Sequence, residues 1–568
     1  MLADGEAHLR DWIARGDETR SDENADASHA TYSYERDHRA QEPLRALPLG
    51  VKRKWLLEML RWELGPVSAG VPLPGVAGVA LDVDRAEILR DLCRHCEVPR
   101  ANSDERERGF GVFGVPGSAS AESTESQESQ DTDASGDEQM TEALASPAEA
   151  PASPAPASPV TTTNKKRAAR GAFLSPPRGG VSVRFVDERG EGAAVRREWF
   201  GLVAERSADF THGLFVSHDG GRSLHPHACS GAINPKTHLK YFAALGRVAA
   251  VALYHGETLP LRLTDAFLDR AVLGARASLE DLKSVDPTLY ANKVRYLMDL
   301  HGSADTAAPT RETGDRETAD VSLDATLRAL DLEWSDAADP TGVFFPGETR
   351  AFTLLPTSLT GSSAPASCPV TAETLATYLR AFVAHRTYGG VAAQTAAFAA
   401  GFGAVVPPPL RARMRSVLRG AELSSLVAGE PGAVDAADWR RNTGYADAPL
   451  AVSFSTRCFW HALERVLTDA ERVDVLRFAT GLSAAPAGGF ANLVGYAGDA
   501  APFTVAELAS DARDAPRALP MAHACFNTIR LPRLDERAFG GSVEAGGEEM
   551  ARRLRVAAAL GARGFDNF

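Results

Sequence analysis

The hydrophobic pattern of the chain is first regular at residues 49–64. Apolar side chains recur there at helical spacing, at Val51, Leu56, Leu57, Met59, Leu60 and Leu64. This spacing predicts a long amphipathic helix. Residues 78–93 start with a short alternation of apolar and polar positions and continue at helical spacing, which predicts a strand followed by a helix. Residues 1–43 are polar and charged with little periodicity, so we expect them to be disordered.

Further along the chain the pattern mixes short strands with helices. The alternating residues 181–188 predict a strand, and residues 197–207 predict a helix. Two short apolar runs flank Gly220-Gly221, which is typical of a β-hairpin. Residues 238–256 form the most apolar helical stretch, and we expect that helix at the centre of a core.

A second group of elements is predicted between residues 330 and 403. Residues 330–335 and 349–355 have the pattern of strands. Residues 371–390 predict a helix that starts at Thr371 as its N-cap and ends in paired glycines. Another helix is expected at about 392–403.

In the last quarter of the chain, the pattern predicts two helices in succession. Residues 457–467 predict one helix. Thr468 and Glu471 have the spacing of a capping box, so the next helix is expected to start there and to end at Gly481.

Shorter apolar runs follow before a final helix. These runs cover residues 502–507 and 525–531. The final helix is expected at about 546–560, with one apolar face formed by Met550, Leu554 and Ala557. About 110 residues is enough for a separate small α/β domain at this end of the chain.

Two segments interrupt these patterns. Residues 103–178 include a stretch, Gly109 to Asn164, without a single Lys or Arg, in which Ser and acidic residues give way to Pro and Ala. Such a segment cannot bury enough apolar surface to offset its ordering entropy, so a disordered insertion is expected. A tolerated loop is its simplest interpretation, and recruitment of a substrate is the alternative. The polar residues 302–320 predict a second loop insertion.

Composition and charge narrow the class of protein. The chain has 568 residues, of which 44% are hydrophobic, and a formal net charge of −14, which argues against a nucleic-acid partner. The start of the chain lacks the pattern of a secretory signal, and Arg247 interrupts the longest apolar run, so no membrane contact is expected. We expect a cytoplasmic protein. The basic residues 164–170 form a solvated charge cluster or, alternatively, a nuclear-import signal.

The cysteines form neither a disulfide framework nor an obvious metal site. Cys93 and Cys96 make a CxxC pair around His95, but a zinc site needs a second ligand pair at suitable spacing. We therefore expect ordinary helix cysteines there, and neither a metal nor a cofactor. The six cysteines are Cys93, Cys96, Cys229, Cys368, Cys458 and Cys525.

Cys525 is the strongest candidate for chemistry. It lies in HACFNTIRL, a short segment bounded by Pro520 and Pro532, where a thiolate could attack and leave an accessible thioester. The alternative is a small buried hydrophobe. His523 lies two residues earlier and would face the same side of an extended segment, favouring the thiolate or moving a proton, unless it only bonds the backbone. Asn527 could brace the loop or simply favour a turn.

These residues belong to a wider set of motifs, and with it the chain resembles a HECT-type ubiquitin-protein ligase domain. The resemblance extends over residues 49–568 apart from the two insertions, and the motifs keep their order and spacing. They are RREWFGL (196–202), INPKTHLKYFAALGRVAAVALYHG (233–256), SVDPTLY (284–290), LDLEWS (330–335), DWRRNTGY (438–445), RFATGLSAAPAGGF (477–490) and LPMAHACFN (519–527).

The resemblance implies an α+β fold in two lobes. A large, mostly helical N-lobe with small β elements would cover residues 44–450, after the disordered residues 1–43. A small α/β C-lobe would cover residues 451–568 and carry Cys525. A flexible hinge is expected within residues 446–456.

The same resemblance implies the reaction and the partners. Ubiquitin would pass from a conjugating enzyme to Cys525 as a thioester, and then to a lysine of a protein substrate. Two sulfurs must meet first, and the loaded cysteine must then reach an amine, which two lobes joined by a hinge make possible. Phe565, fourth from the end, would pack the tail back to orient the loaded C-lobe; a frayed terminus is the alternative.

The resemblance also implies a docking site for the conjugating enzyme. Tyr378 and Phe382, one helical turn apart, align with the aromatic pair that grips this partner. Leu297 and Met298 would line the same groove. The alternative is that aromatic side chains at this spacing form core, and exposure of both rings would favour docking.

Three departures from the family pattern support weaker alternatives. Ala524 replaces the threonine that usually precedes the cysteine, Leu534 stands where a tyrosine is common, and residues 538–549 are longer and richer in glycine. A HECT-fold scaffold with weakened catalysis is therefore one alternative. A cysteine hydrolase acting on ubiquitin is the other, and it would need a distant base from His225, His227, His238, His255, His385 or His461.

Overall fold

The structure is a computed structural model, mostly helical with small sheets. It describes residues 44–65, 79–95, 180–188, 190, 192–306, 323–337, 351–353, 369–430, 432–495, 500–508 and 518–561. The expectations for residues 1–43 and 103–178 fall outside these ranges. The described core divides into three hydrophobic clusters, here called the large, the arm and the C-terminal cluster.

The large cluster surrounds a helix that the sequence places at the centre of a core. This helix, α7 (His238–His255), is buried along nearly its whole length, and the amphipathic α3 (Leu49–Leu64) packs against it. A parallel pair of strands, β1 with β2, and an antiparallel hairpin, β3 with β4, complete the cluster. The other elements are β1 (Val79–Val83), α4 (Ile88–His95), β2 (Val181–Phe185), α5 (Ala193–Ala208), β3 (Phe215–Val216), β4 (His225–Pro226), α6 (Ser230–Ile233), α8 (Asp265–Leu268), α14 (Ala392–Gly403), α15 (Pro408–Val417) and α16 (Gly420–Ala428).

Two glycines let α7 and α14 pack backbone against backbone. A β-carbon added to Gly246 would lie 2.1 Å from the carbonyl oxygen of Phe398. A β-carbon added to Gly401 would lie 1.7 Å from the carbonyl oxygen of Ala243. Both distances are far below any van der Waals contact, so the crossing requires glycine on each helix.

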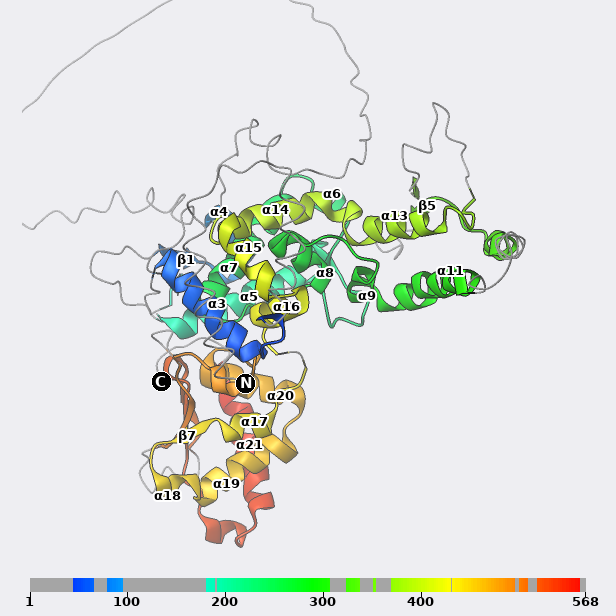
Figure 1. Ribbon diagram of the computed structural model, residues 1–568. Helices are drawn as coiled ribbons and strands as arrows, with labels where there is room; N and C mark the ends of the chain where they lie inside the picture. The colour runs from blue at the N-terminus through cyan, green and yellow to red at the C-terminus, as the bar shows by residue number, and fades with distance from the viewer. Residues whose placement is uncertain are drawn as a thin grey trace, which may run out of the picture.

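The arm cluster projects from the large cluster, at the right of Figure 1, where α11 and α13 run side by side. Three expectations change here. Residues 302–306, expected in a loop, continue α11, and the rest of that insertion lies outside the described residues. The helix expected to start at Thr371 has Thr374 as its N-cap. Of the first expected strand, residues 330–335, only Ser335 lies in a strand, which continues to Ala337. The elements are α9 (Asp281–Val285), α10 (Pro287–Leu289), α11 (Tyr296–Thr306), β5 (Ser335–Ala337), β6 (Ala351–Thr353) and α13 (Leu375–Thr387).

The C-terminal cluster combines a four-stranded sheet with helices. The strand order is β7-β8-β10-β9, with β8 parallel to both neighbours and β9 antiparallel to β10. Figure 1 shows this sheet and its helices below the large cluster. The elements are α17 (Ala436–Arg441), β7 (Thr443–Tyr445), α18 (Ala448–Ala451), α19 (Phe454–His461), α20 (Asp469–Thr480), β8 (Phe503–Glu507), β9 (Met521–His523), β10 (Thr528–Leu531) and α21 (Val543–Gly561).

The C-terminal cluster starts earlier than residue 451. Its first member along the chain is Val434, whereas Val427 still belongs to the large cluster. Strand β7 pairs with β8, so it is part of the C-terminal sheet. The expected hinge at 446–456 contains α18 and the start of α19, and its Leu450 and Phe454 are buried in the C-terminal cluster. The chain therefore crosses between the clusters at 428–433.

Several local predictions are confirmed. The helix at 49–64 has the expected bounds, and the hairpin turns at Gly220-Gly221, both with positive φ. The capping box forms as expected: Thr468 N donates to Glu471 Oε2 at 2.9 Å, and Glu471 N donates to Thr468 Oγ1 at 3.3 Å. The helix then ends at Gly481 in a left-handed conformation.

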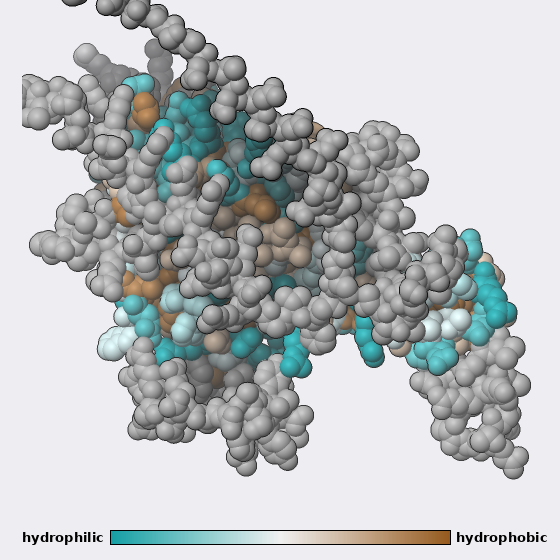
Figure 2. Space-filling model, turned by 90° about the horizontal axis from the view of Figure 1, so that it is seen from above, coloured by the Kyte–Doolittle hydropathy of each residue, from teal (hydrophilic) through white to brown (hydrophobic). Residues whose placement is uncertain are grey.

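Polarity varies over the surface seen from above. Figure 2 shows hydrophobic residues near the middle of this face, whereas the arm at the right carries many hydrophilic ones. Within the described residues, no single helix has the length and apolarity needed to cross a membrane. A helix pair that is bent by 104°, Leu375–Gly403 with Pro408–Val417, meets these criteria jointly, by length and composition only.

Candidate active site around Cys525

Cys525 lies in the tight connection between two paired strands. Strand β9 ends at His523, strand β10 begins at Thr528, and these two residues face each other in the antiparallel register. Residues Ala524–Phe526 form one turn of 3-10 helix. Cys525 is partly exposed and Phe526 is 64% exposed, so the thiol sits on an accessible turn and not inside packed hydrocarbon. This is the exposure that a nucleophile needs.

Asn527 closes the turn and braces it. Its φ of 50° lies in the left-handed region, which asparagine tolerates better than most residues. Its buried side chain donates from Nδ2 to the carbonyl oxygens of Val494 and Ala501, each at 3.0 Å. Val494 is buried and Ala501 is half-buried, so these bonds replace water that folding removes from the two carbonyl oxygens. The expected bracing role of Asn527 is therefore confirmed.

Arg197 reaches the same turn from the large cluster. It lies on α5, and its fully buried side chain donates to atoms far along the sequence. Nη1 donates to the carbonyl oxygens of Thr480 at 2.7 Å and Ala524 at 3.2 Å, and to Asn527 Oδ1 at 3.1 Å. Nη2 donates to the carbonyl oxygen of Val494 at 2.7 Å. The turn that carries Cys525 is thus bonded directly to α5.

A buried ion-pair network holds this arginine in place. Glu257 accepts two hydrogen bonds from Arg196, at 2.8 and 2.9 Å, and one from Arg197 at 3.3 Å. Burial lowers the pKa of Arg197, while the charges of Glu257 and Cys525 act in the opposite direction. Burial alone would raise the pKa of Glu257, but the two arginines hold it at about 2. With two cations and one anion, the network carries one excess positive charge near Cys525.

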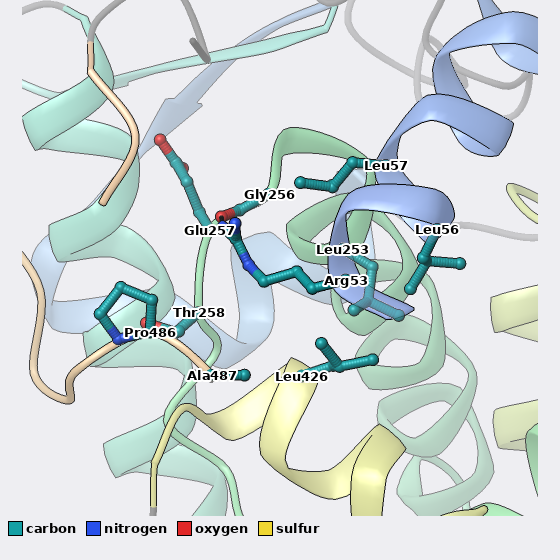
Figure 3. A pocket seen from close by; sticks show the side chains of 10 residues that line it. All are labelled: Arg53, Leu56, Leu57, Leu253, Gly256, Glu257, Thr258, Leu426, Pro486 and Ala487. Carbon is teal, nitrogen blue, oxygen red and sulfur yellow. Dashed lines mark hydrogen bonds between the residues drawn. The ribbon is translucent and has the colours of Figure 1, made fainter. Parts of the chain in front are cut away.

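Glu257 also borders a small pocket between the clusters. Figure 3 shows Pro486 and Ala487 approaching Arg53 of α3 and the Gly256–Thr258 segment. Ala487 is buried in the large cluster, although Ala485 and Phe490 on either side of it in the chain belong to the C-terminal cluster. The loop around residue 487 is therefore a second contact between these clusters, next to the Arg197 contact.

The sequence-predicted site residues are not all brought together. Cys525 and His523 lie on the same hairpin, and His523 is exposed on β9. Phe565 lies outside the described residues. Arg197 and Glu257 were not predicted from the sequence. The only available signal was the adjacent pair of arginines within RREWFGL, a helix that is otherwise largely apolar, where a buried charge needs a partner.

The residues expected to grip a conjugating enzyme form core in this structure. Tyr378, Phe382 and Leu297 are 0%, 1% and 1% exposed, and all belong to the arm cluster. The rings of Tyr378 and Phe382 stack, with centroids 5.9 Å apart. By the exposure criterion this burial favours the core interpretation. Among the described residues of the arm, the exposed large apolar side chains include Tyr296 and Met298 on α11, and also Leu330.

The hydrolase alternative finds little support in the described geometry. Several of the histidines that a hydrolase could use have partners elsewhere: His225 bonds Thr264, His238 bonds Ser230, and His255 bonds the backbone of Val181. Among the described residues, no group of three or more His, Cys, Asp or Glu side chains could hold a metal ion. Of the CxxC pair, Cys93 lies on α4, and Cys96 lies outside the described residues.

Each departure from the family pattern has a place in the structure. Ala524 is buried, and its carbonyl oxygen accepts from Arg197. Leu534 is buried in the C-terminal cluster, and its backbone N–H donates to Ser455 Oγ at 2.8 Å. The glycine-rich stretch lets α21 approach α19, since a β-carbon on Gly546 would lie 2.4 Å from Cys458 Sγ.

Comparisons with known proteins show the family of the chain. The family model described as HECT-domain (ubiquitin-transferase) matches residues 201–567, more than half of the chain. The chain is 30% identical over 353 residues to the E3 ubiquitin-protein ligase HACE1 of Danio rerio, and 29% identical over 353 residues to that of Homo sapiens. It is 30% identical over 356 residues to the E3 ubiquitin-protein ligase TOM1-like of Neurospora crassa.

These comparisons assign the chain to the HECT-domain family. Each alignment covers 62% of this chain. It covers 34% of the Danio rerio relative, 33% of the human relative and 8% of the Neurospora crassa relative. The chain thus spans about a third of the length of these HACE1 proteins.

Proposed function

We propose that this chain is a HECT-type ubiquitin-protein ligase that carries ubiquitin on Cys525. The observation that carries the proposal is the accessible thiol on the β9–β10 turn, braced by Asn527, within a chain of the HECT-domain family. Its expected partners are ubiquitin, a ubiquitin-conjugating enzyme and protein substrates.

The chemistry requires two exchanges at one carbonyl carbon. The thiolate of Cys525 attacks the thioester between ubiquitin and the conjugating enzyme, a new C–S bond forms, and the enzyme's sulfur leaves as a thiolate. A substrate lysine then attacks the same carbon, the bond to Cys525 breaks, and the amine gives up a proton as the amide forms. The exposed His523 is available to accept that proton. The first exchange is nearly balanced in energy, so positioning is the main requirement.

Two lobes with a hinge would supply this positioning. The large and arm clusters together correspond to the N-lobe, and the C-terminal cluster corresponds to the C-lobe. We place the hinge at residues 428–433 instead of 446–456, because Gly429 and Gly432 have φ values of 88° and 95° there. Glycine adopts such angles freely, so this connection can change its path at little cost.

The arm is our candidate for the conjugating-enzyme site. Tyr378 and Phe382 are buried, so we assign them and Leu297 the role of shaping the arm from within. Tyr296 is 46% and Met298 is 36% exposed, and these side chains offer the apolar contact that a partner would need.

The experiment that tests this function is a complete ubiquitination reaction. Activating enzyme, conjugating enzyme, ATP and ubiquitin are mixed with the wild-type chain, and ubiquitin joined to lysine is detected on reducing gels. We expect thiol-resistant products with wild type and none with Cys525→Ala. Cys229→Ala, which removes another partly exposed cysteine, should behave as wild type. Equal product formation by Cys525→Ala would refute the proposal.

A further inference from the structure

The contact between Arg197 and the Cys525 turn joins two parts of the protein that have separate cores. Arg197 belongs to α5, which packs in the large cluster with Trp199, Phe200 and Val203. Apart from Glu257, Arg197 donates to four oxygen atoms, and all four belong to residues between 480 and 527. The side chain of Arg197 therefore reaches from α5 of the large cluster to the Cys525 turn of the C-terminal cluster.

The two ends of the turn depend on this side chain. Ala524 immediately precedes Cys525, and its carbonyl oxygen accepts from Nη1 of Arg197. Asn527 lies two residues after Cys525, and its Oδ1 accepts from the same nitrogen. The guanidinium is planar and its donors are fixed in direction, so it sets the orientation of both acceptors at once.

The shape of the turn has a second, independent support. Nδ2 of Asn527 donates to Val494 and Ala501, and neither bond involves the large cluster. The turn can therefore keep its local conformation when it leaves α5. What Arg197 adds is the placement of Cys525 relative to the large cluster.

We propose that Arg197 is a positioning residue that docks the Cys525 turn on α5 for the transfer of ubiquitin to lysine. This inference rests on the proposed function. Docking covers one side of the turn, because α5 and α20 both pack against it. A lysine side chain can still approach from the exposed side of Phe526, whereas a second protein that must bring its own sulfur to Cys525 needs more room. The docked arrangement therefore suits the amine step better than the loading step.

Glu257 and Arg196 extend this role. Arg196 makes a bidentate pair with Glu257 and donates to the carbonyl oxygen of Val181 at 2.9 Å. Glu257 in turn accepts from Nε of Arg197, which leaves Nη1 free to bond the turn and Nη2 free to bond Val494. The donors of Arg197 are engaged by these acceptors, so it orients the turn and does not itself bind the reacting carbonyl.

The test uses the full chain and separates two steps: loading, in which the thioester forms at Cys525, and discharge, in which ubiquitin passes from Cys525 to an amine. The chain is loaded with labelled ubiquitin, loading is stopped, and free lysine is added as the acceptor. Non-reducing gels report the thioester at Cys525, and its decay reports discharge. We expect Arg197→Lys to load to at least about half the wild-type level and to discharge at least about tenfold more slowly, since misplacing reacting groups by about 1 Å costs up to about 100-fold.

A matched control and a second variant sharpen the result. Arg53→Lys changes another buried arginine at the same junction, which donates to the carbonyl oxygen of Gly256. Both steps should stay near wild type in this variant. Asn527→Gly removes the other end of the contact, together with the bonds from Nδ2 to Val494 and Ala501, and keeps the left-handed backbone. If Arg197→Lys unfolds at the assay temperature, Asn527→Gly carries the same prediction. The double variant should discharge no more slowly than the slower single variant, because the two residues act as one unit.

The possible outcomes distinguish this inference from the proposed function. Absence of a thiol-sensitive adduct on wild type would refute the proposed function itself. A wild-type adduct together with normal discharge by Arg197→Lys would overturn the positioning role alone. Loss of loading and discharge by the same factor would also overturn it, since that result indicates only structural damage.

Discussion

Arg197 and Asn527 share an acceptor, the carbonyl oxygen of Val494. Nη2 of Arg197 donates to it at 2.7 Å and Nδ2 of Asn527 donates to it at 3.0 Å. Arg197 also donates to Oδ1 of Asn527 at 3.1 Å. A residue of α5 and a residue of the Cys525 turn therefore stand in one buried hydrogen-bond network, although 330 positions separate them.

The two amide donors of Asn527 should be needed for stability of the turn. Asn527→Asp keeps the shape and the acceptor for Arg197, but it places a carboxylate oxygen against the carbonyl oxygens of Val494 and Ala501. We expect the free energy of unfolding to fall by about 2 kcal/mol, since each carbonyl oxygen loses one donor and faces a carboxylate oxygen in its place. Chemical denaturation followed by circular dichroism measures the change. An unchanged midpoint would contradict the bracing role, and Asn492→Asp, at a more exposed amide in the same part of the chain, is the control.

The glycine crossing of α7 and α14 should tolerate no side chain. Gly401→Ala would bring a methyl group within 1.7 Å of the carbonyl oxygen of Ala243, so the helices must separate. We expect a loss of about 3 kcal/mol or more in the free energy of unfolding. Gly302→Ala on α11 is the matched control, because nothing lies within 4 Å of its added β-carbon. That variant should gain up to about 1 kcal/mol, since alanine favours a helix. Similar losses in both variants would contradict the close crossing.

A second close contact predicts a rescue. Gly546→Ala on α21 would place its methyl group 2.4 Å from Sγ of Cys458 on α19. We expect a destabilisation of about 1–3 kcal/mol, as for other overpacked sites. Cys458→Ala in the same chain should restore part of the loss, because it removes the sulfur. Purely additive losses in the double variant would show that this sulfur is not the obstacle.

Asp269 should make the stability of the large cluster depend on pH. Burial, together with the charges of Asp281 and Asp265, raises the pKa of Asp269 from 3.8 to about 6, against the hydrogen bond from Gly420 N. Because the pKa of Asp269 is higher in the folded than in the unfolded state, its contribution to the free energy of unfolding is complete below pH 3.8. That contribution is lost as the pH rises through about 6. Asp269→Asn keeps the acceptor but never ionises. We expect the variant to be more stable than wild type by about 1–2 kcal/mol at pH 8, with a smaller gap at pH 5. A constant gap across this range would contradict the assignment.

Local features of the fold could be predicted from the sequence because neighbouring residues produce them. The helix at 49–64 follows from apolar spacing, and the capping box of Thr468 and Glu471 follows from two side chains three positions apart. The hairpin turn at Gly220-Gly221 is equally local. The prolines on either side of Cys525 and the HECT-domain resemblance predict the turn that holds it.

The features that escaped prediction depend on contacts between distant segments. Tyr378 and Phe382 have the same helical spacing whether they face a partner or a core, and only the packing of the arm shows that they are buried. The start of the C-terminal cluster at Val434 depends on β7 pairing with β8, about sixty residues further along the chain. The hydrogen bond from Arg197 to Ala524 cannot be predicted from the sequence around either residue.

The most direct measurement of the central claim is the bond between ubiquitin and one sulfur atom. Wild type, Cys525→Ala and Cys229→Ala are each incubated with activating enzyme, conjugating enzyme, ATP and ubiquitin, and run on gels with and without a reducing thiol. We predict a ubiquitin adduct that disappears on reduction for wild type and Cys229→Ala, and no such adduct for Cys525→Ala. Peptide mass mapping of the wild-type adduct should find ubiquitin's carboxyl end on Cys525. An adduct that survives in Cys525→Ala, or that maps to another cysteine, would contradict the account.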